Sequence, residues 1–576
     1  MKRSLQYKLD KLCSGRIHRE KHHGIIHLTG HCSEWQQAVE AGLLAAKKGS
    51  RTHVVNDIVP DSQVMEHPLG SLPDLRDNSL DGRHPDVLII GGGVIGCAIA
   101  RELTKSKLDI LLIEKEYDVA VHASSRNDGV IHPGIDLLPG LLKKKYNNRG
   151  NPLYDQLARE LDIPFERVGQ HLVFQKRSMK LPAIASLLYF NLSVAGKVRF
   201  IEKNKLHRLE PGLSDRAAFA LFFEGAGIIC PFNLTIALAE NAIQNGAEIS
   251  LNTAALSMDL TRRGKKYITA VHTNRGTIYP RLVISAAGVF AEEIARMAGD
   301  RFFSIHPRKG SSVILDKKVK ANIHSVYSFL QGWNANRHSK GGGIIPTIHG
   351  NVLVGPDAVE VREKEDFSTH RDNLQAVFEK QKNISNWLNP ADTIAYFSGI
   401  RAATYEEDFI LEKGRQTENI LHAAGIQSPG LTAAPAIALK MEKMALTYLS
   451  RFGNVPSNPS FNPYRKAPPH LASLPEKERD RLIRQNPDYG QILCRCEEIS
   501  KGEILDAMRR PLPCFTLDGI KRRVRPTSGR CQGGFCAPLI LPLIAEEAKI
   551  LPENVCKGVP GSRILFGEKG EGREEI

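Results

Sequence analysis

The 576-residue chain is long enough for three or four domains, and its 42% apolar and 24% charged residues exclude a mainly disordered or collagen-like protein. The formal net charge of +15 favours anionic partners, such as phosphorylated or carboxylated substrates. The alternative is that the charge only makes the solvated surface basic. No arginine-rich tract is interleaved with aromatic residues, so nucleic acid is not an expected partner.

Targeting segments are not expected either. No apolar run reaches the roughly 18 residues of a transmembrane helix, and the segment Met1–Gly15 lacks the apolar core of a secretory signal. These features predict a cytoplasmic protein. Ten cysteines are too few for a disulfide scaffold, and four of them form two close pairs near the C-terminus, which in a reducing compartment indicates a metal.

Residues 1–60 are expected to form a small αβ unit. Gly24–Gly30 and Thr52–Ile58 have the pattern of strands, and Ser33 would cap a helix between them that runs through Trp35. This strand–helix–strand order resembles half of a BON domain, and an unspecialised N-terminal extension is the alternative. Residues 61–84 contain proline, aspartate and glycine with little apolar periodicity, so they are predicted to be a linker.

A dinucleotide-binding site is predicted next. The apolar strand Asp86–Ile90 leads directly into Gly91-x-Gly93-x-x-Gly96, and a helix and a second strand that ends at Glu114 follow. Gly91 would permit a tight turn, Gly93 the approach of a pyrophosphate, and Gly96 the packing of helix on strand. The helix N-terminus would bind phosphates, and Glu114 would accept hydrogen bonds from a ribose. The motif by itself does not separate NAD from FAD.

Three later segments favour a flavin. The polar loop His122–Gly134 would meet phosphates and run along the flavin ring, and the strand Leu282–Phe290 ends in small residues. The glycine-rich turn in Ala423–Pro435 enters a helix whose N-terminus would face the electron-rich end of a reduced flavin. From residue 85 to about 450, strand-like runs alternate with helical patterns, which predicts an α/β fold.

On these motifs, the region from about 85 to 450 resembles the D-amino-acid-oxidase-like family of FAD-dependent oxidoreductases. The branch is that of the L-2-hydroxyglutarate oxidases and the anaerobic glycerol-3-phosphate dehydrogenase A subunits. Residues 126–134 and 425–432 match it, except that Asp128 and Pro133 stand where Ser and Ala are usual. The resemblance implies a Rossmann-like FAD-binding domain with an inserted antiparallel-sheet substrate domain. It also implies FAD contacts at Gly91, Gly93, Gly96, Glu114, Ser124, Ser125, Arg126, Asn127, Gly129, Gly288, Gly425, Gln427, Gly430, Leu431 and Thr432.

Oxidation of an alcohol at a flavin needs a base for the hydroxyl proton, and histidine is the natural side chain. His132 is the first candidate, because its loop resembles one that lines the flavin in this family; a structural loop histidine is the alternative. His349, in a turn between two strand-like runs, is the second candidate. Arg401 matches the family position that grips a carboxylate, which a guanidinium can do bidentately. A structural ion pair is its alternative role.

Residues 451–485 contain six prolines and are predicted to be a second linker, followed by a small helical metal domain at 486–550 and a tail at 551–576. Cys494-x-Cys496 and, after 34 intervening residues, a second pair with four residues between its cysteines suit one compact metal centre. Zinc is the competing metal, although CxC is less usual for it. The spacing resembles the bacterioferritin-associated-ferredoxin-type [2Fe-2S] domain, which implies four ligands: Cys494, Cys496, Cys531 and Cys536.

The leading hypothesis is an FAD-dependent dehydrogenase that oxidises a small anionic hydroxy compound, either sn-glycerol 3-phosphate or an L-2-hydroxy acid such as L-2-hydroxyglutarate. Hydride would pass to flavin N5, and electrons would leave through the [2Fe-2S] cluster to a partner protein. By the resemblance, this partner is a second flavoprotein or a quinone-reducing membrane subunit, which would bring the chain to the inner face of a membrane. An amino-acid or imino-acid dehydrogenase and a non-catalytic redox-sensing binding protein are the alternatives.

Overall fold

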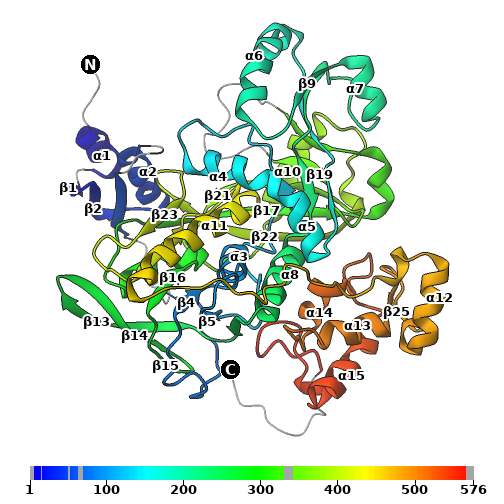
Figure 1. Cartoon of the computed structure of the whole chain (residues 1–576). Helices are drawn as coiled ribbons and strands as arrows, with labels where there is room; N and C mark the ends of the chain where they lie inside the picture. The colour runs from blue at the N-terminus through cyan, green and yellow to red at the C-terminus, as the bar shows by residue number, and fades with distance from the viewer. Residues whose placement is uncertain are drawn as a thin grey trace.

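The computed structural model describes residues 5–14, 16–47, 49, 52–61, 69–329 and 342–565. Figure 1 shows a large central body with the N-terminal unit on one side and the C-terminal domain on the other. Among the described residues, none of the helices combines the length and the apolar character needed to cross a bilayer.

A six-stranded sheet forms the dinucleotide-binding half of the central body. Its order is β12-β5-β4-β16-β24-β23, and all neighbours are parallel except β23 and β24. The strands are β4 (Val87–Ile90), β5 (Ile110–Ile113), β12 (Glu248–Ser250), β16 (Leu282–Ser285), β23 (Ile410–Lys413) and β24 (Ile420–Ala424). Four of them are buried along their whole length, as strands covered on both faces must be. The apolar runs predicted as strands at 86–90 and 109–113 are confirmed.

Different elements cover the two faces of this sheet. One face packs in a large apolar core against α3 (Val94–Leu103), α8 (Pro231–Gln244) and α11 (Gly430–Leu449). The other face packs against α9 (Ala291–Met297) and a meander of β13 (Ala255–Arg263), β14 (Lys265–Thr273) and β15 (Gly276–Ile278). Because both faces are covered, only the ends of the strands remain open for a ligand.

A nine-stranded sheet forms the second half, in the order β21-β17-β20-β19-β18-β8-β10-β9, with β22 also paired to β17. All pairs are antiparallel except β8 with β18, so the expected antiparallel substrate sheet is confirmed with that exception. The strands are β8 (Gln170–Phe174), β9 (Val198–Glu202), β10 (Phe219–Phe223), β17 (Ile305–Leu315), β18 (Val326–Phe329), β19 (Gly343–Pro346), β20 (Val352–Gly355), β21 (Val359–Glu360) and β22 (Thr393–Thr404).

Helices α6 (Lys180–Ser193), α7 (Lys203–Leu209) and α10 (Arg371–Lys382) pack against this second half, and so does a small sheet. Helices α4 (Leu142–Gly150) and α5 (Tyr154–Leu161) pack instead in the large core of the first half. The small sheet has the order β6-β11-β7, from β6 (Val130–Ile131), β7 (Phe165–Glu166) and β11 (Gly227–Ile229). Strand β6 continues directly from the polar loop that was predicted to line the flavin, so this sheet anchors the loop.

The N-terminal unit has the order α1 (Leu5–Cys13), β1 (Ile17–His22), β2 (Ile25–Cys32), α2 (Trp35–Ala45) and β3 (His53–Pro60). The predicted strand–helix–strand is confirmed as β2, α2 and β3, although Glu34 rather than Ser33 caps the helix. The sequence did not reveal β1, because five of its six side chains are exposed. The resemblance to a BON domain stays a prediction. The unit is docked on the central body, since Val54 N donates to Glu406 Oε1 at 2.6 Å.

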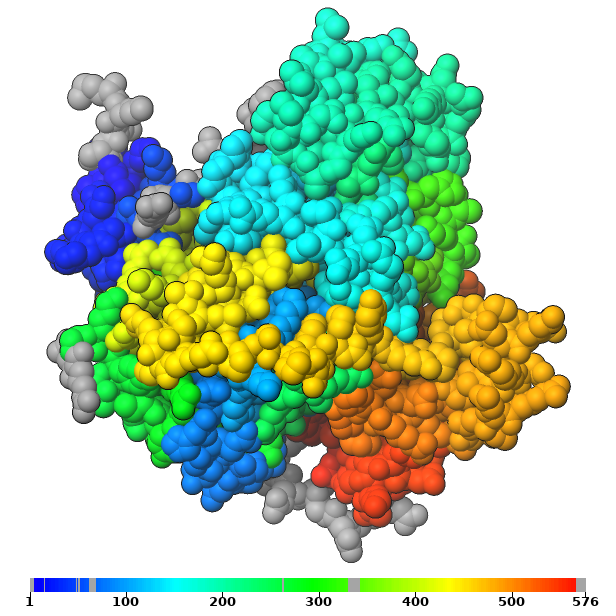
Figure 2. All heavy atoms as spheres, viewed as in Figure 1, coloured from blue at the N-terminus to red at the C-terminus, as the bar shows by residue number. Residues whose placement is uncertain are grey.

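Both predicted linkers pack closely against the central body. In the first, Leu80 is buried, and Arg275 binds Asp77 through both carboxylate oxygens. The second crosses the surface in Figure 2 and inserts Arg465, whose Nε donates to the buried Glu240 at 2.5 Å. It also contains a helix, α12 (Glu476–Gln485). The sequence did not indicate this packing, because these proline-containing segments lack apolar periodicity. The contacts are made by single side chains, which leave no periodic pattern.

The C-terminal domain has its own small apolar core. Its elements are β25 (Ile492–Cys494), β26 (Ile499–Ser500), α13 (Lys501–Met508), α14 (Leu517–Val524) and α15 (Ala537–Ala548), so the predicted helical domain is present. The described part of the predicted tail packs against this domain: Val555 is buried, and Lys557 pairs with Asp518 at 3.2 Å. The rest of the tail lies outside the described residues.

Candidate functional site

The glycine-rich turn between β4 and α3 has the geometry that the sequence predicted. Gly91 has φ +116°, and a Cβ there would lie 2.5 Å from the Ala286 carbonyl oxygen. A Cβ on Gly96 would lie 1.9 Å from the Gly91 carbonyl oxygen, so only glycine lets α3 approach the strand this closely. Gly93 is the N-cap of α3, and a Cβ there would lie 3.1 Å from Ser124 Oγ.

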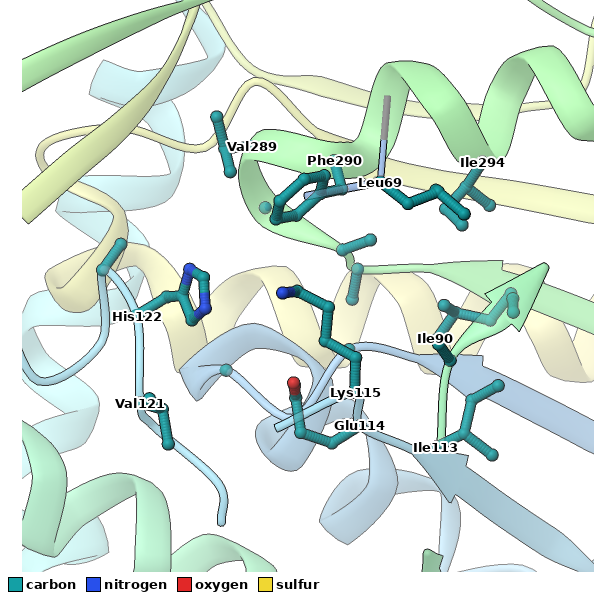
Figure 3. A pocket seen from close by; sticks show the side chains of 18 of the residues that line it. Leu69, Ile90, Ile113, Glu114, Lys115, Val121, His122, Val289, Phe290 and Ile294 are labelled. Atoms are coloured by element: carbon teal, nitrogen blue, oxygen red, sulfur yellow. The ribbon is translucent and has the colours of Figure 1, made fainter. Parts of the chain in front are cut away.

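A cavity of about 140 Å³ opens beside this turn, at the carboxyl ends of β4, β5 and β16. Figure 3 shows Glu114 and Lys115 on one side of it and Leu69 and Phe290 on the other. Five of the predicted cofactor contacts line the cavity: Gly91, Gly93, Glu114, Ser124 and Gly288. A position at the ends of parallel strands is where dinucleotides bind in such folds.

The carboxylate of Glu114 is held by backbone amides. It accepts hydrogen bonds from Gly92 N at 2.5 Å and from Glu116 N at 2.9 Å. Burial raises the pKa of Glu114, because the charged form loses water. A partly buried carboxylate at the end of the second strand, on the wall of the cavity, fits the adenosine ribose of a dinucleotide.

Sequence reasoning missed part of this wall. Leu69 and Leu72, from the predicted linker, line the cavity, as do Lys115 and Phe290. The ammonium group of Lys115 pairs with Glu116 at 2.8 Å and with Glu365, and it lies 5.0 Å from the centre of the Phe290 ring. These contacts tie the linker, the strand end and a distant loop together over the cavity. The linker carries no motif, so its sequence offered no signal.

The polar loop after Glu114 is shaped largely by its own side chains. Ser124 Oγ accepts a hydrogen bond from Val94 N at 2.9 Å and so caps α3 beside the cavity. Ser125 and Asn127 bond to carbonyl groups within the loop, and Arg126 Nε donates to the Val121 carbonyl at 3.1 Å. These three predicted cofactor contacts therefore shape the loop, and their contact with FAD stays a prediction.

Two arginines meet where the substrate sheet approaches this loop. β17 and β22 pair in register at Arg308 and Arg401, so both side chains lie on one face of the sheet. Arg308 is compensated, because its Nε donates to Glu360 at 2.5 Å and its Nη2 donates to Glu407 at 2.7 Å. Sequence reasoning missed these three residues. Charged positions within an otherwise apolar strand were the signal that could have found Arg308.

Arg401 is not compensated in the same way. Its Nη2 donates to the Asp357 carbonyl at 3.1 Å, and among the described residues it makes no ion pair. Burial and the neighbouring Arg308 lower the pKa of Arg401, while Asp128 favours its charge. A Cβ on Gly310 would lie 2.4 Å from the guanidinium, so glycine provides the space that Arg401 occupies. A cation with only a carbonyl partner suits an anionic ligand.

The glycine-rich turn that follows β24 joins these two groups. Thr432 Oγ1 accepts a hydrogen bond from His132 N at 2.8 Å. Gln427 Nε2 donates to Glu407 at 2.9 Å, on the carboxylate that also holds Arg308. Of the other predicted contacts in this region, Gly129 precedes β6, Gly425 follows β24, and Gly430 and Leu431 begin α11. The structure thus brings the His132 loop, the turn and the arginine pair to one site.

His349 lies away from the two arginines, and its expected role at the flavin stays a prediction. Its turn joins β19 to β20, beyond the end of β17 at Leu315. From Arg308 to Leu315 the strand spans about 23 Å at about 3.3 Å a residue. Burial lowers the pKa of His349 well below its usual value, and the nearby cations Arg525 and Lys317 lower it further. The sequence indicated the turn from neighbouring residues alone. Only the register of the sheet shows that the turn lies at the end of the sheet away from the arginines.

The four predicted ligand cysteines come together as two pairs in the C-terminal domain. Cys496 Sγ and Cys531 Sγ are 3.3 Å apart. A hydrogen bond from Cys536 lowers the pKa of Cys494 to about 6, and the backbone amides of Thr527 and other residues also donate to it. Four neighbouring thiols with amide donors fit the thiolate ligands that would hold a [2Fe-2S] cluster.

The fold and these two sites define a class: a dinucleotide-binding oxidoreductase joined to a small thiolate-ligated metal domain. Comparison with known families agrees with this class. The model of the FAD-dependent oxidoreductase family matches residues 86–444, and that of the BFD-like [2Fe-2S] binding domain matches residues 492–546. The chain therefore belongs to the FAD-dependent oxidoreductase family. FAD is the cofactor of its large domain, and the C-terminal domain is of the [2Fe-2S] type.

Similar proteins are found along most of the chain. A glycerol 3-phosphate dehydrogenase of Caloramator mitchellensis is 38% identical over 84% of this chain and 98% of its own length. A mitochondrial L-2-hydroxyglutarate dehydrogenase of Nematostella vectensis is 26% identical over 62% of this chain and 78% of its own. The FAD-bound, dithionite-reduced L-α-glycerophosphate oxidase of Mycoplasma pneumoniae is 28% identical, with a TM-score of 0.61, over 67% of this chain and 99% of its own.

Proposed function

We propose that the protein is a dehydrogenase that oxidises the secondary hydroxyl of sn-glycerol 3-phosphate. The observation that carries the proposal is Arg401, which pairs in register with Arg308, is within electrostatic range of Asp128 in the His132 loop, and has a carbonyl as its hydrogen-bond partner. The 38% identical relative, a glycerol 3-phosphate dehydrogenase, supports phosphate as the anion. An L-2-hydroxy acid is the second candidate, because Arg401 would bind a carboxylate equally well and a 26% identical relative is an L-2-hydroxyglutarate dehydrogenase.

The proposal assigns one role to each of these residues. Arg401 holds the anionic group of the substrate and so fixes which C–H bond faces the flavin. His132 accepts the hydroxyl proton as the C–H hydrogen leaves with its electron pair, and the bond from its backbone to Thr432 holds its loop beside the turn that follows β24. Glu407 keeps Arg308 compensated, so Arg401 is the cation left for the substrate. FAD, when bound, supplies the acceptor for the hydride.

We infer that the electrons then leave through the four-cysteine domain. A [2Fe-2S] centre carries one electron at a time, so it suits transfer to a partner protein better than direct reaction with oxygen. A second flavoprotein or a quinone-reducing membrane subunit would be such a partner and would place the chain at the inner face of a membrane. The basic charge of the chain is compatible with an acidic partner.

The test is anaerobic bleaching of the flavin in cluster-loaded protein by sn-glycerol 3-phosphate, L-2-hydroxyglutarate, L-lactate and amino acids, each added alone. We expect bleaching by glycerol 3-phosphate. Arg401→Met should raise its half-saturating concentration at least about tenfold, and the exposed Arg296→Met should not. His132→Gln should slow bleaching by about 10²–10⁴. Bleaching by L-2-hydroxyglutarate alone would support the second candidate, and bleaching by an amine alone, or by nothing in the panel, would contradict the proposal.

A further inference from the structure

The outer face of α6 exposes large apolar side chains. Leu181, Leu188 and Leu192 are 79%, 72% and 81% exposed, and Ile184 and Tyr189 are exposed beside them. Their spacing places Leu181, Ile184, Leu188 and Leu192 along one stripe of the helix, about 17 Å long at about 1.5 Å a residue. The helix stands at the upper edge of the molecule in Figures 1 and 2. Soluble monomers rarely keep such a continuous apolar stripe in water.

Packing within the fold does not require this stripe. The inner face of α6 already supplies the contacts to the sheet: Ala183 is buried, and Leu187, Phe190 and Val194 pack against the core of β8, β9 and β10. The helix is thus apolar on both faces, and the outer face has no partner within the described residues. A helix that is apolar all round is expected in a buried or lipid environment.

Two polar side chains of the helix, Ser186 and Asn191, make their hydrogen bonds within the fold. Ser186 Oγ donates to the Ala183 carbonyl at 2.7 Å. Asn191 donates to the Leu187 carbonyl at 2.9 Å and accepts from Val198 N at 2.9 Å. The stripe therefore offers little directional hydrogen bonding to a protein partner, whose interface would normally carry about one hydrogen bond per 100–200 Å². The hydrocarbon region of a lipid bilayer needs no hydrogen bonds from the helix.

The charge around α6 has one sign. From residue 175 to 201 the chain contains five basic residues and no acidic one. Lys180 pairs with Glu202 and Arg199 with Glu224, but Lys176, Arg177 and Lys197 make no ion pair among the described residues. These three side chains are exposed at the two ends of the helix. Basic residues beside an apolar stripe are the pattern that binds the anionic surface of a bilayer.

We propose that α6 docks this chain directly on an anionic lipid bilayer, lying in the interface with its leucine stripe inserted and its basic ends toward the headgroups. The docked helix is coupled to the candidate active site, because Ala195 N donates to the Pro133 carbonyl at 2.9 Å, one residue from His132. The inference goes beyond the proposed function, which reaches a membrane only through a partner. It does not depend on the identity of the substrate.

The test is flotation of the full-length holoprotein with vesicles of phosphatidylcholine alone and of phosphatidylcholine with phosphatidylglycerol. We expect the wild type to float with the anionic vesicles and binding to fall at high salt. The variant L181Q/L188Q/L192Q should lower the partition coefficient at least about tenfold. The control L439Q/L551Q, which changes exposed leucines outside α6, should not. The variant K176Q/R177Q/K197Q should lose the preference for anionic lipid and keep its thermal midpoint.

Three results would overturn the proposal. The first is a wild type that floats with neither kind of vesicle. The second is a triple-leucine variant that floats as well as the wild type. The third is a wild type that ignores vesicles but forms a dimer that the leucine variant abolishes, which would show that the stripe pairs with a second copy. Flavin bleaching by substrate, measured in the same preparations, tests the proposed function separately.

Discussion

The carboxylate of Asp118 accepts hydrogen bonds from both terminal nitrogens of Arg523, at 2.8 and 3.1 Å. Both side chains are almost completely buried. Asp118 belongs to the loop that leaves the dinucleotide sheet after Glu114, whereas Arg523 lies on α14 of the four-cysteine domain. A buried, bidentate ion pair thus joins the two redox domains, and a third hydrogen bond from Arg522 at 3.2 Å supports it.

Asp118→Asn should loosen this joint. The substitution leaves the buried Arg523 without its counter-charge, which costs about 3–5 kcal/mol when such a pair is broken. We expect flavin reduction by substrate to stay within about twofold of the wild type while electron transfer from flavin to cluster slows, as followed by stopped-flow absorbance. The control is Asp480→Asn, which breaks an exposed pair on α12. Equal transfer rates in the two variants would show that Asp118 does not set the docking.

Gly93→Val should abolish FAD binding. Gly93 lines the cavity at the start of α3, so a branched side chain there would occupy the space that a pyrophosphate needs. The purified protein should be colourless, and its apoprotein should still melt cooperatively. A fully flavinated Gly93→Val protein would mean that the cofactor does not approach this turn.

Leu72→Gln should weaken FAD binding through the predicted linker. Leu72 lines the cavity, and glutamine would replace apolar surface there. Burial of a leucine side chain contributes about 1.5 kcal/mol, so the FAD dissociation constant should rise roughly tenfold. Leu75→Gln is the matched control, since Leu75 is exposed in the same segment and does not line the cavity. Fluorescence titration of apoprotein with FAD measures both constants, and identical values would rule out a role for the segment.

Cys494→Ser should separate the two redox centres. We expect the variant to lose its iron and the visible absorption of the cluster, while substrate still bleaches the flavin anaerobically. Cys556→Ser is the control, because Cys556 lies outside the two cysteine pairs and should leave the iron content unchanged. Loss of bleaching in a folded, flavinated Cys494→Ser protein would contradict the independence of the centres.

His349 should make the protein sensitive to acid. Because burial depresses its pKa in the folded state, the unfolded chain binds a proton first as the pH falls below about 6.5. The neutral, buried His349 is compatible with the folded state above that pH. Below it, the free energy of unfolding falls by at most about 1.4 kcal/mol for each pH unit. His349→Gln should therefore narrow the difference in unfolding free energy between pH 7 and pH 5. Denaturant titrations that show an unchanged difference would exclude this assignment.

The cofactor sites could be predicted from the sequence because their requirements are local. A tight turn needs glycine at Gly91 and Gly96 whatever surrounds it, and a strand buried on both faces needs the apolar run that precedes the turn. The cysteine spacing that resembles a cluster domain likewise stands in short segments. The structure confirms the turn and the strands, and it brings the four cysteines together in one domain.

Other features depended on contacts between distant segments. His349 and His132 both stand in polar turns, and only the register of β17 with β20 and β22 shows that His349 lies far from the arginine pair. Leu72 lines the cofactor cavity because its segment packs there, and this packing leaves no periodic pattern in the sequence of the segment.

The sequence by itself thus determined the class of chemistry, because backbone conformation and hydrophobic period are properties of neighbouring residues. Only tertiary structure decided which of two arginines in paired strands is held by carboxylates: Glu360 and Glu407 hydrogen-bond to Arg308, whereas the hydrogen-bond partner of Arg401 is a carbonyl. The docking of the cluster domain through Asp118 and the exposure of the leucines on α6 were decided in the same way. Ion pairing and burial depend on which groups the fold brings within a few ångströms, and chain order does not encode those distances.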